Sequence, residues 1–218
     1  IIAHEYAHGL TRRLTGGAED ANCLFQEQSS GMGEGWSDWL ALTMTATLTD
    51  SPIIPRAIGT YASGEPHSGA GIRNFPYTRD MGVNPLTLAD IASLNRPHGV
   101  GEVWASALWD LYWNLVNAYG FDDNLYSGTG GNNVLMQIVI EGLKLQGCNP
   151  TFLEARDAII TADLIENAGA NQCLIWEAFA RRGMGESAFV GTASNLNATE
   201  AFDQPTMCSM QCGNGVVD

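Results

Sequence analysis

The stretch EGWSDWLALTMTATL, residues 34–48, has the composition of a helix that is buried in the middle of a domain. Apolar residues occupy most of its positions, and a helix that is apolar on all sides is normally covered by other elements. Its two carboxylates, Glu34 and Asp38, are four residues apart and project from one face, about one turn from each other. Because an isolated buried charge is too costly, Glu34 must be paired, protonated or bound to a metal.

The rest of the chain has the periodicity of helices and almost nowhere the alternation of strands, so the predicted fold class is mainly α. Residues 51–97 are rich in Pro, Gly, Ser and Asn and should form loops, which at this length are usually functional. Five other helices are predicted: one that ends near Leu14, one from Gly101 to near Gly120, one from about Asn133 to Leu145, one that begins at the capping box of Thr151 and Glu154, and one over QCLIWEAFARRGMG.

At 218 residues the chain can hold one domain of ordinary size. We expect a helical catalytic subdomain over residues 1–190, a linker over 191–206, and the start of a truncated Cys-rich segment over 207–218. The first motif begins at the fourth residue, and the sequence has neither an initiator Met nor a signal peptide. We therefore expect a fragment of a longer precursor, and the missing targeting segment says nothing about location.

Charge and composition argue against two broad classes of function. Ten Lys and Arg against 24 Asp and Glu leave a net charge of −14, whereas nucleic-acid binding is largely carried by clustered Lys and Arg. No apolar run approaches the roughly 18 residues that a membrane span requires. An acidic chain with Lys144 as its only lysine fits a secreted bacterial or fungal enzyme.

Five cysteines favour the disulfides of a secreted protein over the buried thiols of an intracellular one. Cys148 and Cys173 flank a stretch that has the pattern of a helical hairpin, so we expect a disulfide between them that ties its ends together. The odd number of cysteines again suggests that part of the protein is missing.

A second motif, HEYAHGL at residues 4–10, has the spacing of a zinc site. On a helix, His4 and His8 project from the same face and can share one zinc ion. Glu5 lies about 100° round from His4, where it can reach a water on the metal as a general base. The alternative is a chance pattern, which arises in roughly one chain per hundred of this size, so a third ligand is needed. Glu34 is the candidate ligand.

Asp38 is the natural acceptor for the outer N–H of a ligand histidine, because it lies on the same helix face as Glu34. The alternative for Asp38 is an ordinary carboxylate on a helix surface. One turn of the buried helix thus offers both a metal ligand and the support of another ligand.

HEYAHGL followed by GMGEGWSDW resembles the fungalysin family of secreted zinc metallopeptidases, relatives of thermolysin whose third zinc ligand is a glutamate. HGVGEVWASALWDLY and CLIWEAFARRGMG also resemble the helical C-terminal subdomain of that family, so the resemblance covers about residues 1–190. It implies a helical subdomain of a thermolysin-like enzyme. It also implies that one Zn²⁺ binds to His4, His8 and Glu34, that Glu5 is the catalytic carboxylate, and that Asp38 orients a ligand histidine.

The resemblance implies two further residues of the active site. His98, in PHGVGEVW, and Arg73, in GIRNFPY, would help to hold the substrate carbonyl oxygen and the neighbouring peptide. The alternatives are a residue with one local hydrogen bond at the start of a helix for His98, and a structural ion pair for Arg73. One departure stands out: no tyrosine lies between Tyr6 and Tyr61, where thermolysin-like sites carry one. His67 matches no motif and is expected to be a loop residue.

These residues predict a secreted zinc endopeptidase that hydrolyses proteins or peptides, with Glu5 taking a proton from the attacking water. The alternatives are a zinc aminopeptidase and a non-catalytic metal-binding or adhesive module of a larger extracellular protein. The other wall of the cleft would come from the missing N-terminal subdomain, or propeptide, of the same precursor. Acidic residues are numerous, but no loop has a readable pattern of calcium ligands.

Overall fold

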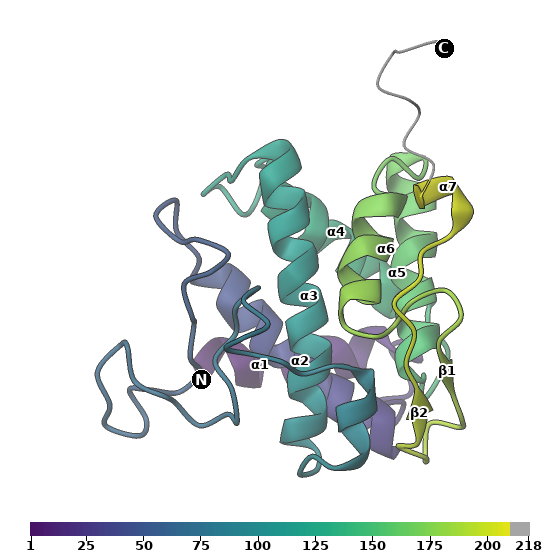
Figure 1. The fold of residues 1–218 in the computed structure, drawn as a ribbon, viewed down its shortest axis with the longest axis horizontal. Helices are drawn as coiled ribbons and strands as arrows, with labels where there is room; N and C mark the ends of the chain where they lie inside the picture. The colour runs from purple at the N-terminus through teal and green to yellow at the C-terminus, as the bar shows by residue number, and fades with distance from the viewer. Residues whose placement is uncertain (210–218) are drawn as a thin grey trace.

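The computed structural model describes residues 1–209 and confirms a mainly helical fold (Figure 1). In this part of the chain the elements are α1 (Ile2–Leu14), α2 (Glu27–Met44), the 3₁₀ helix η1 (Leu88–Ala92), α3 (His98–Tyr119), α4 (Gly131–Leu145), α5 (Phe152–Asn167), α6 (Gln172–Arg181), β1 (Phe189–Val190), β2 (Ala198–Thr199) and α7 (Thr206–Ser209). No helix among the described residues combines the length and the apolar character needed to cross a membrane.

The centre of the fold is the pair α2 and α3. Figure 1 shows α3 running through the middle of the molecule, with α5 and α6 on one side and the long segment between α2 and α3 on the other. Every residue from Gly99 to Leu115 is buried. The Trp104 ring packs against Trp36 of α2, Phe152 of α5 and Phe179 of α6, at centroid distances of 5.4, 5.5 and 5.4 Å. Four helices therefore meet at one indole, and each such aromatic contact adds about 0.5–1.5 kcal/mol to the free energy of burial.

Glycines bring the backbones of α2 and α3 almost into contact. A Cβ atom on Gly35 would lie 2.5 Å from the Gly101 carbonyl oxygen and 2.8 Å from Trp104 Cβ. A Cβ on Gly101 would lie 2.5 Å from the Gly31 carbonyl oxygen and 2.7 Å from Glu34 Cβ. Any side chain here would force the two helices apart, so this crossing fixes where Glu34 stands relative to the first turn of α3.

Helix α2 begins at Glu27, seven residues before the predicted start at Glu34, because distant residues complete its N-terminus. Its own N-cap residue makes no side-chain capping bond. Instead, Asn149 Oδ1 accepts hydrogen bonds from the amides of Phe25 and Gln26, at 2.9 and 3.2 Å. Gln28 Nε2 donates to the Asn195 carbonyl oxygen at 2.6 Å. The polar start of this helix has no apolar periodicity, so the sequence pattern did not reveal it.

The other helices lie close to their predicted ranges. Helix α3 begins at His98, three residues before the predicted Gly101, and ends at Tyr119 as expected. The predicted capping box at the start of α5 is present, with the Thr151 hydroxyl accepting from the Glu154 amide and the Glu154 carboxylate accepting from the Thr151 amide.

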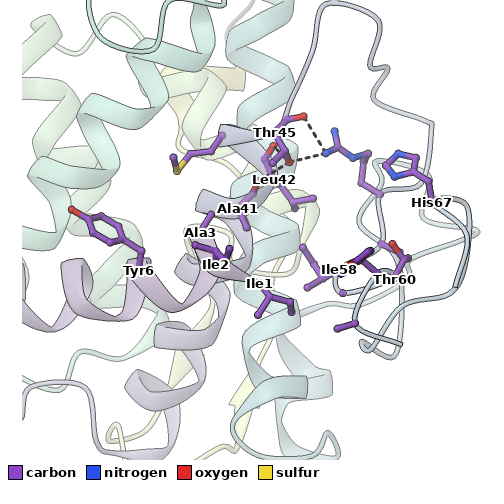
Figure 2. Close-up of a pocket in the computed structure, with 16 residues that line it drawn as sticks. Ile1, Ile2, Ala3, Tyr6, Ala41, Leu42, Thr45, Ile58, Thr60 and His67 are labelled. Atoms are coloured by element: carbon purple, nitrogen blue, oxygen red, sulfur yellow. Dashed lines mark hydrogen bonds between the residues drawn. The ribbon is translucent and has the colours of Figure 1, made fainter. Parts of the chain in front are cut away.

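A cavity of about 860 Å³ opens between the first turn of α1, the end of α2 and the loop that follows it (Figure 2). Its lining is mostly apolar and includes Ile2, Tyr6, Leu42 and Ile58. Ile2 and Tyr6 are 90% and 73% exposed. Helix α1 thus carries an apolar face open to solvent in addition to the face that packs on α2.

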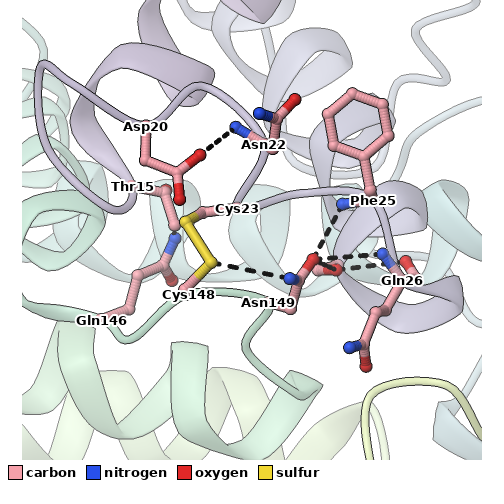
Figure 3. Close-up of a disulfide and its surroundings, with 10 residues drawn as sticks. Thr15, Asp20, Asn22, Cys23, Phe25, Gln26, Gln146, Cys148 and Asn149 are labelled. Carbon is pink, nitrogen blue, oxygen red and sulfur yellow. Dashed lines mark hydrogen bonds between the residues drawn. A yellow bond between two sulfur atoms is a disulfide. The ribbon is translucent and has the colours of Figure 1, made fainter.

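The predicted disulfide between Cys148 and Cys173 is wrong. Cys148 pairs with Cys23 (Figure 3), and Cys173 pairs with Cys208. The reason is that the intervening stretch is one helix, not a hairpin. Helix α5 has 16 residues and a length of about 24 Å, and the two cysteines flank its opposite ends. Disulfide Cα atoms lie within about 7 Å of each other, so this pair cannot form. The general prediction of disulfides is confirmed.

Residues 191–206, where a linker is predicted, lie against the helices. Strand β2 pairs with β1, Leu196 is 5% exposed, and Ala201 pairs with Met184 beyond α6. Most of the predicted Cys-rich segment, from residue 210 onward, lies outside the described residues, so the proposed domain boundaries stay a prediction.

Candidate metal centre

Helix α1 carries both histidines on the face that packs against α2. His4 is buried, with 5% of its surface exposed, and His8 is partly buried. Their rings lie edge to face with centroids 4.8 Å apart, as expected for residues one turn apart on a helix. Helix α1 ends at Leu14 as predicted, so the motif lies within one continuous helix.

Helix α2 brings Glu34 to both histidines. Glu34 Oε2 lies 3.3 Å from His4 Nε2, and Glu34 Oε1 lies 3.6 Å from His8 Nε2. One ligand atom from each of the three residues falls within 4.8 Å of the others. Because α2 begins at Glu27, Glu34 stands two turns inside the helix rather than at its start, and α3 covers it from the far side.

Asp38 lies beneath this cluster and holds three groups. Its Oδ1 accepts from His4 Nδ1 at 2.8 Å. Arg73 donates to both of its oxygens, at 2.7 and 2.9 Å, and the buried Tyr77 hydroxyl donates to Oδ2 at 2.6 Å. Burial alone would raise the pKa of Asp38, but these donors lower it below its ordinary value. Sequence reasoning did not single out Tyr77, which lies 39 residues away in a loop.

Ser37 is a second residue that sequence reasoning missed. Its hydroxyl donates to the Gly33 carbonyl oxygen at 2.9 Å and lies 3.2 Å from His8 Nδ1. Since the Ser37 hydroxyl donates to Gly33, its Oγ can accept a hydrogen bond from the N–H of His8 Nδ1. In their neutral forms both histidines then carry the proton on Nδ1, and both Nε2 lone pairs face Glu34.

Proton equilibria in the cluster follow from these contacts. Burial lowers the pKa of His4, but the carboxylates of Asp38 and Glu34 outweigh it and raise that pKa to about 9. Burial lowers the pKa of His8 below its ordinary value. Burial also opposes ionisation of Glu34, yet the surrounding histidines, with His4 first, hold its pKa below the usual range. Glu34 is therefore an anion that lies between the His4 and His8 rings.

The donor set fits a metal ion. Glu34 Oε2 is buried and has no hydrogen-bond partner among the described residues, which is costly unless something else satisfies it. Two imidazole nitrogens and one carboxylate, with a fourth position open, form the ligand set of catalytic zinc sites. The cluster of Asp20, Cys23 and Cys148 differs, because its two sulfurs are joined in a disulfide.

The remaining predicted residues surround this cluster. Glu5 is exposed on α1 beside His4 and acts electrostatically on His8. His98, the first residue of α3, is half exposed, and its Nε2 lies 3.4 Å from Glu34 Oε2. Arg73 is mostly buried on Asp38, with Nη2 3.7 Å from Glu34. An ion pair of Arg73 is therefore present, and its contact with substrate stays a prediction.

Two other residues lie away from the cluster. His67 lines the cavity at the start of α1 and makes no part of the group around Glu34. Tyr61 lines the same cavity and is 97% exposed.

Two crossing helices that present a pair of histidines and a glutamate form the arrangement expected of the helical subdomain of a metallopeptidase. Residues 1–188 match the family described as "Fungalysin metallopeptidase (M36)", and the chain belongs to this family. The resemblance noted in the sequence is thereby confirmed.

Curated relatives are fungal proteins. The chain is 43% identical to "Extracellular metalloproteinase MEP" of Neosartorya fischeri over 92% of this chain and 32% of that protein. It is 40% identical to "Extracellular metalloproteinase" of Pyrenophora tritici-repentis over 100% of this chain and 33% of that protein. "Extracellular metalloproteinase 2" of Arthroderma otae is 39% identical over 95% of this chain and 33% of that protein. The chain thus spans about a third of the length of these relatives.

Proposed function

We propose that this chain is the zinc-binding helical subdomain of a secreted endopeptidase. The observation that carries the proposal is the convergence of His4 Nε2, His8 Nε2 and the unsatisfied Glu34 oxygen, with the exposed Glu5 next to them. Membership of a metallopeptidase family and the names of the relatives support it.

His4 and His8 would hold the metal through Nε2, and Glu34 would hold it through its carboxylate. When bound, zinc supplies a water of lowered pKa and a Lewis acid for the scissile carbonyl group. Asp38 and Ser37 keep the histidine protons on Nδ1, so that the ligand lone pairs point at the metal position. The histidine side chains would thus already be oriented for the metal before it binds.

Glu5 acts as the general base. Its exposed position beside His4 lets it take a proton from the attacking water and pass that proton to the leaving nitrogen. His98 is half exposed at the open side of the cluster, where it donates a hydrogen bond to the oxyanion that develops. Two of the three guanidinium nitrogens of Arg73, Nε and Nη2, donate to Asp38, so the main effect of Arg73 is to neutralise charge beneath the site.

We further propose that the rest of the cleft comes from another part of the same protein. The relatives are about three times as long as this chain. Ile2, Tyr6 and Tyr61 expose apolar surface around the cavity at the start of α1, as expected for a face that another domain covers. Secretion is proposed from the relatives' names and the two disulfides.

The test uses a protein of the relatives' full length that contains this chain. We expect it to cleave casein and an internal bond of a peptide with a blocked amino terminus, to lose activity to a chelator, and to regain it with zinc. Glu5→Gln should lower kcat about 10²–10⁴-fold while zinc content, measured by mass spectrometry, stays at one per protein. Glu19→Gln, an exposed carboxylate after α1, is the matched control and should behave like wild type.

Three results would contradict the proposal. If Glu5→Gln hydrolysed substrate as fast as wild type while zinc stayed bound, Glu5 would not be the general base. Cleavage only at free amino termini would indicate an aminopeptidase. Zinc binding by the wild type without any hydrolysis would indicate a non-catalytic metal-binding module.

A further inference from the structure

Glu102, in the second turn of α3, makes contacts that the proposed mechanism does not use. The residue is 1% exposed. Its Oε1 accepts from the amide nitrogen and from Nδ2 of Asn74, both at 2.9 Å, and its Oε2 accepts from the amide of Phe75 at 3.2 Å. Every one of these donors belongs to the two residues that follow Arg73. One carboxylate of α3 therefore holds the loop that carries Arg73.

These hydrogen bonds fix the backbone conformation at Arg73. The Asn74 amide belongs to the same planar peptide unit as the Arg73 carbonyl group, so holding the amide sets the ψ angle of Arg73. Phe75 is held in the same way one residue later. Asn74 Nδ2 also donates to Asn95 Oδ1, at 3.2 Å, which ties the loop to the segment before α3. The Arg73 backbone is thus fixed before its guanidinium meets Asp38.

Glu102 also lies one turn after His98 on α3. Residues four apart on a helix share a face, so the helix that presents His98 also anchors the Arg73 loop. The side chains of His98 and Arg73 both approach one oxygen of Glu34. His98 Nε2 lies 3.4 Å and Arg73 Nη2 lies 3.7 Å from Glu34 Oε2. The spacing of His98 and Arg73 beside Glu34 therefore depends on Glu102.

We propose that Glu102 is a positioning residue of the peptidase site, which places Arg73 on Asp38 and in register with His98. The proposal rests on the proposed peptidase function, because its catalytic effect is exerted through Arg73. Burial raises the pKa of Glu102, while the loop donors and the nearby Arg73 charge oppose that rise. The loop thus supplies the donors that a buried carboxylate needs.

A carboxylate of α5 makes the same kind of contact away from the site and provides a matched control. Asp163 is fully buried and accepts from the amide and the Nδ2 of Asn171, at 3.0 and 2.6 Å. It holds the turn between α5 and α6, which carries no residue of the metal centre. Asp163→Asn therefore measures what the loss of a buried carboxylate does to the fold alone.

The experiment compares Glu102→Gln with Asp163→Asn in a protein of the relatives' full length. Glutamine keeps the size of the side chain, but its NH₂ group cannot accept a hydrogen bond from the loop. We expect kcat/KM to fall on the order of ten- to a hundredfold in Glu102→Gln, with zinc content unchanged. Amide exchange in a peptide covering residues 70–78 should be at least tenfold faster. Asp163→Asn should keep kcat/KM within twofold and leave that exchange unchanged.

A double variant shows whether Glu102 acts through Arg73. If it does, Glu102→Gln costs less than about twofold in kcat/KM when Arg73 is already alanine. The proposal would be overturned if the losses of kcat/KM in the two single variants multiplied in the double variant. It would also be overturned if Glu102→Gln had the kcat/KM and the amide exchange of the wild type. If the wild type hydrolyses nothing, the peptidase function fails, and the exchange measurement still decides whether Glu102 holds the loop.

Discussion

Each histidine of α1 uses its Nδ1 atom for a contact inside the protein, His4 with Asp38 and His8 with Ser37. The two contacts differ in kind, because Asp38 is a charged acceptor and Ser37 is a neutral one. His4 is therefore the more strongly held of the two proposed ligands, and we expect the geometry of the site to depend most on the Asp38 carboxylate.

Replacement of Asp38 should weaken metal binding. In Asp38→Asn one carboxylate oxygen becomes an NH₂ group, which cannot accept a hydrogen bond from either Arg73 or His4, so the His4 ring loses its fixed orientation. We expect zinc affinity to fall about ten- to a hundredfold, measured by competition with a chromogenic chelator. Asp50→Asn is the control, because Asp50 also pairs with an arginine, Arg56, but makes no contact with the histidines. Equal zinc affinities of wild type and Asp38→Asn would contradict this role.

At the scale of elements, the crossing of α2 and α3 determines the position of Glu34. The glycines at this crossing have no side chains to interdigitate, so the helices approach until their backbones touch. Sequence periodicity predicted both helices but gave no sign of the crossing. Glycine is unfavourable in helices, and its presence at residues 31 and 35 is explained by the packing against α3.

Two substitutions in α2 separate packing from helix propensity. In Gly35→Ala the new methyl group would lie 2.5 Å from the Gly101 oxygen, so the free energy of unfolding should fall by about 1–3 kcal/mol and zinc affinity should fall with it. In Gly33→Ala nothing lies within 4 Å of the added atom, so the free energy of unfolding should stay or rise by up to about 1 kcal/mol. Urea unfolding measures both. Equal effects would show that the crossing tolerates a methyl group.

For the whole molecule, the disulfides connect parts of the chain that no helix pattern links. Cys23–Cys148 joins the turn before α2 to the turn before α5, next to Asn149, which completes the N-terminus of α2. Figure 3 shows Asn149 between this disulfide and Phe25 and Gln26, the two residues before α2. Cys173–Cys208 fastens the C-terminal segment to α6.

Removal of the first disulfide should destabilise the protein more than removal of the second. The bridges close loops of 125 and 35 residues, for which chain entropy gives about 5 and about 4 kcal/mol. Cys23→Ala with Cys148→Ala should therefore lower the free energy of unfolding by about 1 kcal/mol more than Cys173→Ala with Cys208→Ala. Urea denaturation of the two double variants makes the comparison, and the reverse order would contradict the chain-entropy argument.

Much of the candidate site could be predicted because it is local. His4 and His8 share a helix face by their spacing, and so do Glu34 and Asp38, since an α-helix brings residues four apart together whatever surrounds it. The apolar stretch around Trp36 and Trp39 likewise required a buried helix.

By itself, then, the sequence determined the helices and which side chains lie together within each of them. The tertiary structure decided the contacts between segments. These are the ion pair of Arg73 with Asp38, the contact of Ser37 with His8, the hydrogen bonds of Glu102 to the Arg73 loop, and the pairing of the cysteines. The physical reason is range. Backbone geometry fixes neighbours within one turn, whereas residues 28 to 125 positions apart meet only when the helices have packed.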